Sequence, residues 1–170
     1  MAGDPAWDFR TLNYETDVAK AEALDQSVGQ FVANDPDLRP FKKRGGKIIQ
    51  YHGFGEPEIA SEDSIRYYDR LVKHFGHVRD VDEFYRLYMV PGMGHCGGGA
   101  GATDQFDMIA ALEGWVERGV APTSVLASQV TNGVTVRTRP LCPYPQVAQW
   151  KGSGNTDEAA NFACVKDTDR

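Results

Sequence analysis

The chain has 170 residues, enough for one domain with a hydrophobic core but short for an enzyme with a deep cleft. Its formal net charge is −6 and its basic residues form no cluster larger than the run at 41–47, which excludes the concentrated basic face of a nucleic-acid-binding protein. No stretch approaches the roughly 20 apolar residues of a membrane span, and residues 1–10 lack the cationic start and apolar core of a secretory signal.

The first forty residues predict an irregular segment followed by an amphipathic helix. Apolar residues at steps of three and four, from Val18 to Phe31, mark one face of this helix. Thr16 or Asp17 is the expected N-cap, and Pro36 is expected to stop the helix before it. The basic run that follows is expected to be a solvated loop.

Residues 41–138 predict an alternation of strands and helices with polar loops at the strand ends. The expected elements are a strand at 47–52, a helix at 61–75, a strand at 83–92, a helix at about 104–118, and strands at 124–130 and 134–138. This order is typical of an α/β fold, and we expect a mostly parallel sheet with flanking helices.

The tail from 139 to 165 is rich in proline, glycine and polar residues and shows little periodicity, so it is expected to be irregular. It contains Cys142 and Cys164, and the third cysteine is Cys96. An odd number of cysteines leaves one thiol without a partner inside the chain. We expect one domain made of three segments, 1–40, 41–138 and 139–170.

Two unusual loops follow two predicted strands. The sequence HGFGEPE comes after the first and PGMGHC after the second. Because the carboxyl ends of parallel strands meet at one edge of a sheet, these loops should lie side by side. An acid after one strand and a histidine after the next is the order found in α/β-hydrolase triads. His95 is the expected base and Glu56 the expected acid, with Glu58 as a less favoured alternative.

The other histidines have structural interpretations. His52 ends a strand and is expected to hydrogen-bond in the turn, and His74 and His77 flank a helix end, where a cation is mildly favoured. A metal site built from His95, His52 and Glu56 is an alternative, but neither an H-x-x-x-H nor a C-x-x-C spacing supports it. We therefore predict no metal and no other cofactor.

Three segments carry a family resemblance. They are GGKIIQYHGFGEPEI, FYRLYMVPGMGHCGGG and RPLCPYPQVAQWKGSGNTDEAANFACV, and together with their surroundings they resemble the C-terminal part of the tannase/feruloyl esterase family from about residue 7 to 165. Relatives include the mono(hydroxyethyl) terephthalate hydrolases. The resemblance implies an α/β-hydrolase fold with a lid inserted earlier in the chain, and hydrolysis of esters of aromatic acids such as gallate and ferulate. It implies that His95 is the catalytic histidine and that the protein is secreted or periplasmic.

The resemblance also assigns the cysteines. It implies a disulfide between Cys142 and Cys164, and a second disulfide from Cys96 to an upstream cysteine beside the nucleophilic serine. Cys96 would then hold the catalytic ring close to the nucleophile. Both bonds require an oxidising compartment.

Two features depart from the family pattern. Glu56 stands where the family has an aspartate, and the 170 residues contain no G-x-S-x-G element, since the KGSGN segment at Ser153 has the wrong spacing. We therefore interpret the chain as the C-terminal part of a serine esterase without its nucleophile half and lid. It is predicted to be inactive alone, with an aromatic-acid ester as substrate once an N-terminal portion or self-association completes it. The alternative is a non-catalytic binding or interaction module that uses the hydrolase fold.

Overall fold

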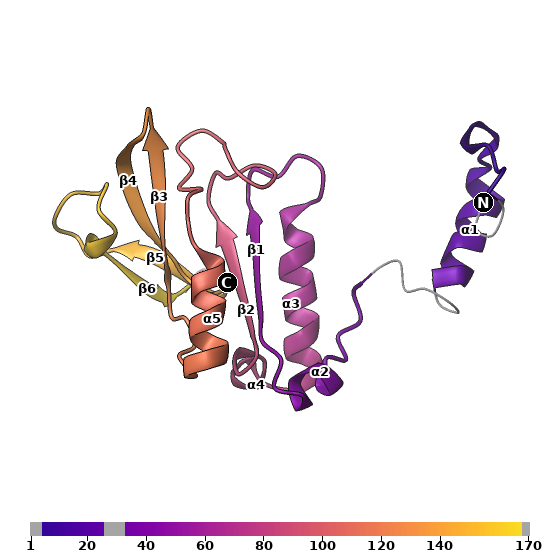
Figure 1. Cartoon of the computed structure of the whole chain (residues 1–170), viewed down its shortest axis with the longest axis horizontal. Coiled ribbons are helices and arrows are strands. Elements are labelled where there is room, and N and C mark those ends of the chain that lie inside the picture. Colours follow the sequence, from indigo (N-terminus) through magenta and orange to yellow (C-terminus); the bar gives the residue numbers. More distant parts are fainter. Residues whose placement is uncertain (1–4, 26–32, 168–170) are drawn as a thin grey trace. The chain divides into compact units, whose positions relative to one another are not determined.

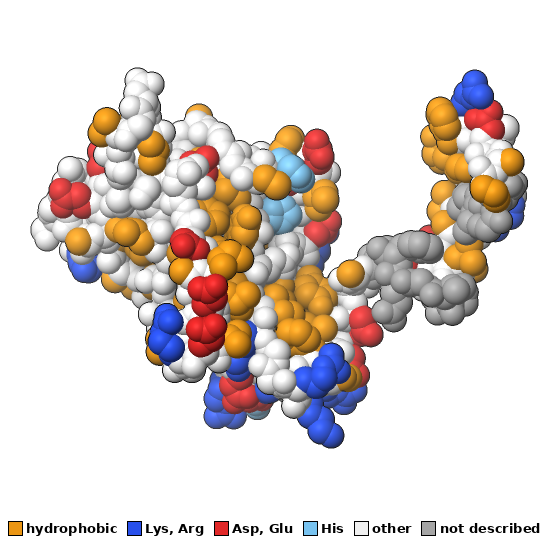
Figure 2. All heavy atoms as spheres, viewed as in Figure 1, with side chains coloured by type: hydrophobic (Ala, Val, Ile, Leu, Met, Phe, Trp, Pro, Cys, Tyr) orange, Lys and Arg blue, Asp and Glu red, His pale blue; other side chains and the backbone are white. Residues whose placement is uncertain are grey.

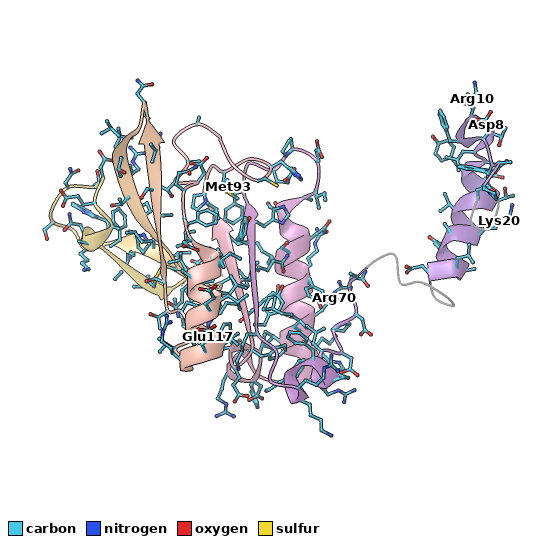
Figure 3. The ribbon with its side chains drawn as sticks, in the orientation of Figure 1. Asp8, Arg10, Lys20, Arg70, Met93 and Glu117 are labelled. Atoms are coloured by element: carbon cyan, nitrogen blue, oxygen red, sulfur yellow. A yellow bond between two sulfur atoms is a disulfide. The ribbon has the colours of Figure 1, made fainter. Side chains whose placement is uncertain are left out.

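The computed structural model describes residues 5–25 and 33–167. The chain divides into two units, Met1–Asp35 and Pro36–Arg170, and each is described by itself. The first unit contains a 3-10 helix, η1 (Phe9–Thr11), and helix α1 (Tyr14–Leu24). Beside η1, Arg10 forms an ion pair with Asp8 at 2.8 Å (Figure 3).

Helix α1 begins earlier than the sequence predicted. Its N-cap is Asn13, whose side chain accepts hydrogen bonds from the backbone N–H groups of Glu15 and Thr16, and Asp17 accepts from the backbone of Asn13 in return. This reciprocal bonding satisfies the free N–H groups of the first turn, so the predicted caps Thr16 and Asp17 lie inside the helix. The end of the predicted apolar face, Val28 and Phe31, lies outside the described residues.

The second unit is an α/β structure. Its elements in chain order are α2 (Arg39–Lys43), β1 (Ile48–Gly53), α3 (Ser61–Phe75), α4 (Val78–Asp82), β2 (Tyr85–Val90), α5 (Met108–Arg118), β3 (Val125–Thr131), β4 (Val134–Leu141), β5 (Gln146–Trp150), η3 (Ala159–Asn161) and β6 (Phe162–Lys166). In Figure 1, α3 and α5 flank the β1–β2 pair, and the later strands lie beyond β2. No helix among the described residues is long and apolar enough to cross a membrane.

The β1–β2 pair is parallel, as expected, and it separates two hydrophobic clusters. On β2, Tyr85 and Leu87 pack into a cluster that includes Leu71 of α3. Tyr88 and Val90 belong to a second cluster that includes residues of α5, β3 and β4. Neighbouring side chains of a strand point to opposite faces, so the almost continuous apolar sequence of β2 is explained by burial on both sides.

The remaining strand pairs among the described residues are antiparallel. Fewer strands therefore pair in parallel than the sequence suggested. β3 pairs with β4 through a turn at Asn132 and Gly133, which have φ values of 51° and 77°. Positive φ at both positions is the geometry of a two-residue hairpin, which an Asn-Gly pair favours. The sequence therefore carried a hairpin signal that the parallel-sheet interpretation did not use.

The tail is more regular than predicted. β5 and β6 form an antiparallel pair, and a disulfide joins Cys142 to Cys164, as the family resemblance implied. All five residues of β5 are exposed, which explains why no apolar alternation marked this strand in the sequence. Backbone pairing and the disulfide hold the tail where side-chain burial contributes little.

In the second unit, one helix starts later than predicted and two short helices were not predicted. Helix α5 begins at Met108 and not near Asp104, because Asp107 caps it and Gln105 pairs with Ser128 of β3. The short helices α2 and α4 were not predicted, and α2 includes the start of the basic run that was expected to be a loop. Helix α3 matches its predicted range, and Gly76, whose φ is 93°, caps its C-terminus after Phe75.

Candidate active site

Two loops leave the same end of the parallel pair. Gly53 and Val90 are partners in the register, so the segment after β1 and the segment after β2 start side by side. Phe54 donates its backbone N–H to the Val90 carbonyl at 3.0 Å, and Gly55 donates to the Met93 carbonyl at 2.8 Å. These backbone bonds fix the position of one loop relative to the other.

Gly53 is required for this close approach. A Cβ atom at Gly53 would lie 2.1 Å from the carbonyl oxygen of Met93, so the two backbones touch where a side chain would have to stand. Met93 is 2% exposed and lies at the loop end of β2 (Figure 3). The glycine after the strand therefore sets the distance between the two loops.

The loop that carries His95 folds on itself. Gly94 donates its N–H to the Gly98 carbonyl at 3.1 Å, and the N–H of Gly98 donates to the Asp104 carboxylate at 2.7 Å. The Gly98 bond is the main cause of a lowered pKa at Asp104, which keeps this acceptor charged. At Gly99, with φ of 107°, a Cβ atom would lie 1.9 Å from the Gly92 carbonyl oxygen. Only glycine fits at position 99. The loop can therefore turn back on itself around His95.

Glu56 and His95 meet between the two loops. Glu56 Oε2 lies 2.6 Å from His95 Nδ1, and Glu56 Oε1 accepts the backbone N–H of Glu58 at 2.9 Å. The carboxylate side chain is 5% exposed whereas the imidazole is 53% exposed. Figure 2 shows histidine side chains on the surface at the loop end of the sheet. A shielded carboxylate thus contacts one ring nitrogen of an imidazole that is about half exposed.

The electrostatics favour an ionised acid. The backbone N–H of Glu58 is the main cause of a lowered pKa at Glu56, partly opposed by burial and assisted by His95. An ionised carboxylate only accepts hydrogen bonds, so Nδ1 of a neutral His95 carries the hydrogen and Nε2 carries the lone pair. This arrangement can take a proton from a hydroxyl group placed at Nε2.

The structure favours Glu56 over Glu58 as the partner of His95, because the contribution of Glu58 to this contact is its backbone N–H. The ligand atoms of Glu56, Glu58 and His95 nevertheless lie within 4.8 Å of one another. Both oxygens of Glu56 already accept hydrogen bonds, so a cation at this point would compete with the bond to His95.

The remaining histidines lie outside this pair. His52 Nδ1 is 2.7 Å from the Ser64 hydroxyl on α3, and His74 lies 3.5 Å from the Asp37 carboxylate. His77 directly precedes α4, and its side chain does not cap that helix. His52 therefore bonds to a helix and not within its turn, and among the described residues it is not part of the Glu56–Glu58–His95 cluster.

A polar chain that the sequence reasoning missed lies beneath the loops. The Tyr85 hydroxyl donates to the Gln50 carbonyl oxygen, and the Gln50 amide donates to the Ser64 hydroxyl at 2.8 Å. Ser64 in turn contacts His52. The sequence did indicate that these side chains share a face, because Gln50 and His52 are two residues apart in β1 and side chains two apart lie on the same side of a strand. These bonds attach the end of β1 to α3.

Cys96 follows the histidine and is exposed, with no disulfide to either described cysteine. Its backbone has a φ of 58°, an uncommon value for a residue with a side chain. The predicted bond from Cys96 to an upstream cysteine stays a prediction.

Comparison with known proteins extends these observations. The family described as "Tannase and feruloyl esterase" matches residues 2–165. The chain is 49% identical over 136 residues to a mono(2-hydroxyethyl) terephthalate hydrolase from Piscinibacter sakaiensis, covering 78% of this chain and 22% of that protein. It is 38% identical over 180 residues to a probable feruloyl esterase B-2 from Aspergillus terreus, covering 95% of this chain and 33% of that protein.

Solved structures give the same result for the fold. The crystal structure of feruloyl esterase B from Aspergillus oryzae matches with a TM-score of 0.76 and 31% identity, covering 94% of this chain and 34% of that one. An esterase from the same organism matches with a TM-score of 0.79 and 32% identity, covering 95% of this chain and 35% of that one. The chain therefore spans about a third or less of the length of these relatives.

Proposed function

Because the chain belongs to the tannase and feruloyl esterase family, a family of carboxylic ester hydrolases, we propose that Glu56 and His95 are the acid and base of a serine-dependent ester hydrolase. The observation that carries this proposal is the 2.6 Å contact between Glu56 Oε2 and His95 Nδ1, in which the imidazole side chain stays 53% exposed. Glu56 takes the place that an aspartate occupies in the family pattern.

In the proposed reaction, Nε2 of His95 removes the proton from a serine hydroxyl as its oxygen attacks the ester carbonyl. The imidazolium that forms is stabilised by the Glu56 carboxylate and then protonates the leaving alcohol. A water molecule, activated by the same nitrogen, hydrolyses the acyl-enzyme and restores the serine. The role of Glu56 throughout is to keep the hydrogen on Nδ1 and the ring in place.

The serine is proposed to lie in a segment outside these 170 residues. The sequence has no G-x-S-x-G element, and its relatives are about three times as long or more. Among the described residues β1 pairs with β2 alone, so its other edge offers free backbone groups to a further strand. The exposed thiol of Cys96 is also available to an upstream cysteine.

The substrate class proposed is an ester of an aromatic acid. The names of the relatives point to feruloyl and terephthalate esters, both of which have an aromatic acyl group. The proposed location is an oxidising compartment outside the cytoplasm, because the Cys142–Cys164 disulfide persists under such conditions.

The decisive experiment replaces the matching part of the 49% identical hydrolase from Piscinibacter sakaiensis with this chain. Hydrolysis of ferulate and terephthalate esters is then measured for the chimera and for its His95→Ala, Glu56→Gln and Glu56→Asp variants. We expect His95→Ala to abolish turnover, Glu56→Gln to lower kcat strongly and Glu56→Asp to retain activity. The matched control is His77→Ala, which should leave kcat unchanged. A chimera that folds and hydrolyses these esters equally well without His95 would disprove the assignment.

A further inference from the structure

A cavity separate from the candidate active site lies between the β1 loop, β2, β4 and the tail. Its volume is about 380 Å³, and neither Glu56 nor His95 lines it. The lining is mainly apolar and includes Phe54, Leu141 and Phe162. A cavity of this size and lining fits one small organic molecule with a single aromatic ring or two fused rings.

Two arginines are set in this apolar lining. Arg139 places its guanidinium carbon 4.2 Å from the centre of the Phe162 ring and donates one N–H to the Thr138 carbonyl at 2.8 Å. Among the described residues, no carboxylate lies within ion-pair distance of Arg139. Burial is the main cause of a lowered pKa at Arg139; the neighbouring Arg137 adds to this shift, and the charge of Asp157 partly opposes it. The cation is thus partly desolvated without a countercharge in contact with it, which an anion would relieve.

Arg137 has a partner already. Its Nε donates to the Asp157 carboxylate at 2.6 Å. One of its terminal nitrogens would lie 3.6 Å from a Cβ atom placed at Gly101, on the segment that follows His95. Asp167 also lines the cavity and is its acidic member. With Arg137 neutralised by Asp157, Arg139 is the cation that an added carboxylate would meet.

We propose that this cavity binds a small aromatic carboxylate, with the ring among the apolar side chains and the carboxylate against Arg139. A planar guanidinium group can donate two parallel hydrogen bonds to a carboxylate, and a low local dielectric strengthens this contact. The proposal is independent of the proposed catalysis, since it needs neither the serine nor His95.

The test uses the 170-residue chain and three probes: 2-naphthoate, its neutral amide 2-naphthamide, and acetate. Binding is followed by calorimetry and by the backbone amide chemical shifts of a ¹⁵N-labelled sample. We expect 2-naphthoate to bind at least tenfold more tightly than either 2-naphthamide or acetate, and to shift the amides of Leu141 and Ala148 more than that of His95. Equal binding of acid and amide, shifts centred on His95, or no binding at millimolar concentration would each overturn the proposal.

Variants locate the anion contact. Arg139→Gln should weaken 2-naphthoate binding at least tenfold and leave 2-naphthamide binding unchanged, and Arg139→Lys should retain part of the affinity. Arg118→Gln is the matched control because it removes the same charge at an exposed position outside the cavity. If Arg139→Gln unfolds the chain, the acid-against-amide comparison on the unchanged chain still decides the question. Equal losses for Arg118→Gln and Arg139→Gln would show a general charge effect and contradict the proposal.

Discussion

At the scale of single residues, the candidate site depends on the contact between two side-chain atoms and on a glycine beside it. The Glu56–His95 contact needs an acid that stays ionised beside the ring. The backbone N–H of Glu58 is the main cause of the lowered pKa of Glu56, which favours the ionised form. The site also needs the two loops in contact, which the absence of a Cβ at Gly53 permits. The geometry of the candidate site therefore depends on backbone groups as much as on the Glu56 and His95 side chains.

The lowered pKa of Glu56 predicts a pH dependence of stability. A carboxyl group whose pKa is lower in the folded state contributes stability above its unfolded pKa, about 4.3, and loses it as the pH falls through the lower folded value. The free energy of unfolding should thus differ between the wild type and Glu56→Gln by a constant amount above about pH 5, and the difference should shrink below about pH 4. Urea denaturation at pH 7, 5, 4 and 3 measures this.

The control for that titration is Glu58→Gln, which keeps the backbone N–H that bonds to Glu56. Its pH profile should follow the wild type. A difference between wild type and Glu56→Gln that stays the same down to pH 3 would contradict a lowered pKa at Glu56.

A methyl group at Gly53 should separate the loops. Because the new Cβ would stand 2.1 Å from the Met93 carbonyl oxygen, Gly53→Ala should cost more than about 2 kcal/mol in the free energy of unfolding. Gly133→Ala is the comparison, since its Cβ meets open space and the cost there comes from its φ of 77°, about 1 kcal/mol. Chemical denaturation of both variants measures the difference, and equal costs would show that the loops are not in tight contact.

At the scale of elements, the tail hairpin is held in a different way from the sheet. β2 is buried on both faces, whereas β5 is exposed along its length and depends on pairing with β6 and on the Cys142–Cys164 bond. The arginine-lined cavity lies between these two regions. Its shape should therefore depend on the disulfide.

Loss of the disulfide should loosen the tail before the sheet. In the chain-entropy account, a crosslink across a separation of 22 residues contributes about 3 kcal/mol, so a Cys142→Ser, Cys164→Ser variant should lose about that much stability. Hydrogen exchange should speed up in β5 and β6 while β1 and β2 stay protected. Cys96→Ser is the control and should leave exchange unchanged. Non-reducing peptide mapping that joins Cys96 to either tail cysteine would contradict the observed pairing.

At the scale of the whole molecule, Glu56 and His95, the proposed acid and base, meet in a chain whose sequence has no G-x-S-x-G element. Apolar side chains such as Ile109 and Val116 of α5 are more than half exposed, at 67% and 59%. Figure 2 shows apolar surface over the region between α5 and α3. Within the described part of the chain β1 has a strand partner on one edge, and its other edge, together with these apolar surfaces, offers a place for the further segment of the proposed enzyme.

The isolated chain should show no specific esterase turnover. Removal of a nucleophile lowers kcat by about 10⁶-fold in serine hydrolases, so hydrolysis of ferulate esters by the purified chain should resemble that of free imidazole. The measurement compares the chain with its His95→Ala variant under saturating substrate. Saturable turnover that disappears in the variant would mean that this chain contains a nucleophile of its own.

Much of the second unit could be predicted from local sequence. The apolar runs of β1 and β2 and the range of α3 follow from periodicity and glycine punctuation, and Glu56 and His95 follow from their places after two successive strands. The antiparallel pairs were harder to predict, because β5 has no buried face to impose an alternating pattern. The start of α5 depends on the bridge between Gln105 and Ser128, which are distant in sequence.

The sequence by itself determined the α/β class, the order of acid and histidine, and, through the family resemblance, the pairing of Cys142 with Cys164. The sequence left Glu58 as a less favoured alternative to Glu56. The tertiary structure places the Glu56 carboxylate 2.6 Å from His95 Nδ1, whereas Glu58 bonds to Glu56 through its backbone N–H. Tertiary structure alone placed Arg139 in an apolar cavity over Phe162. Periodicity reports which residues are buried, whereas distances between loops depend on contacts that span the fold.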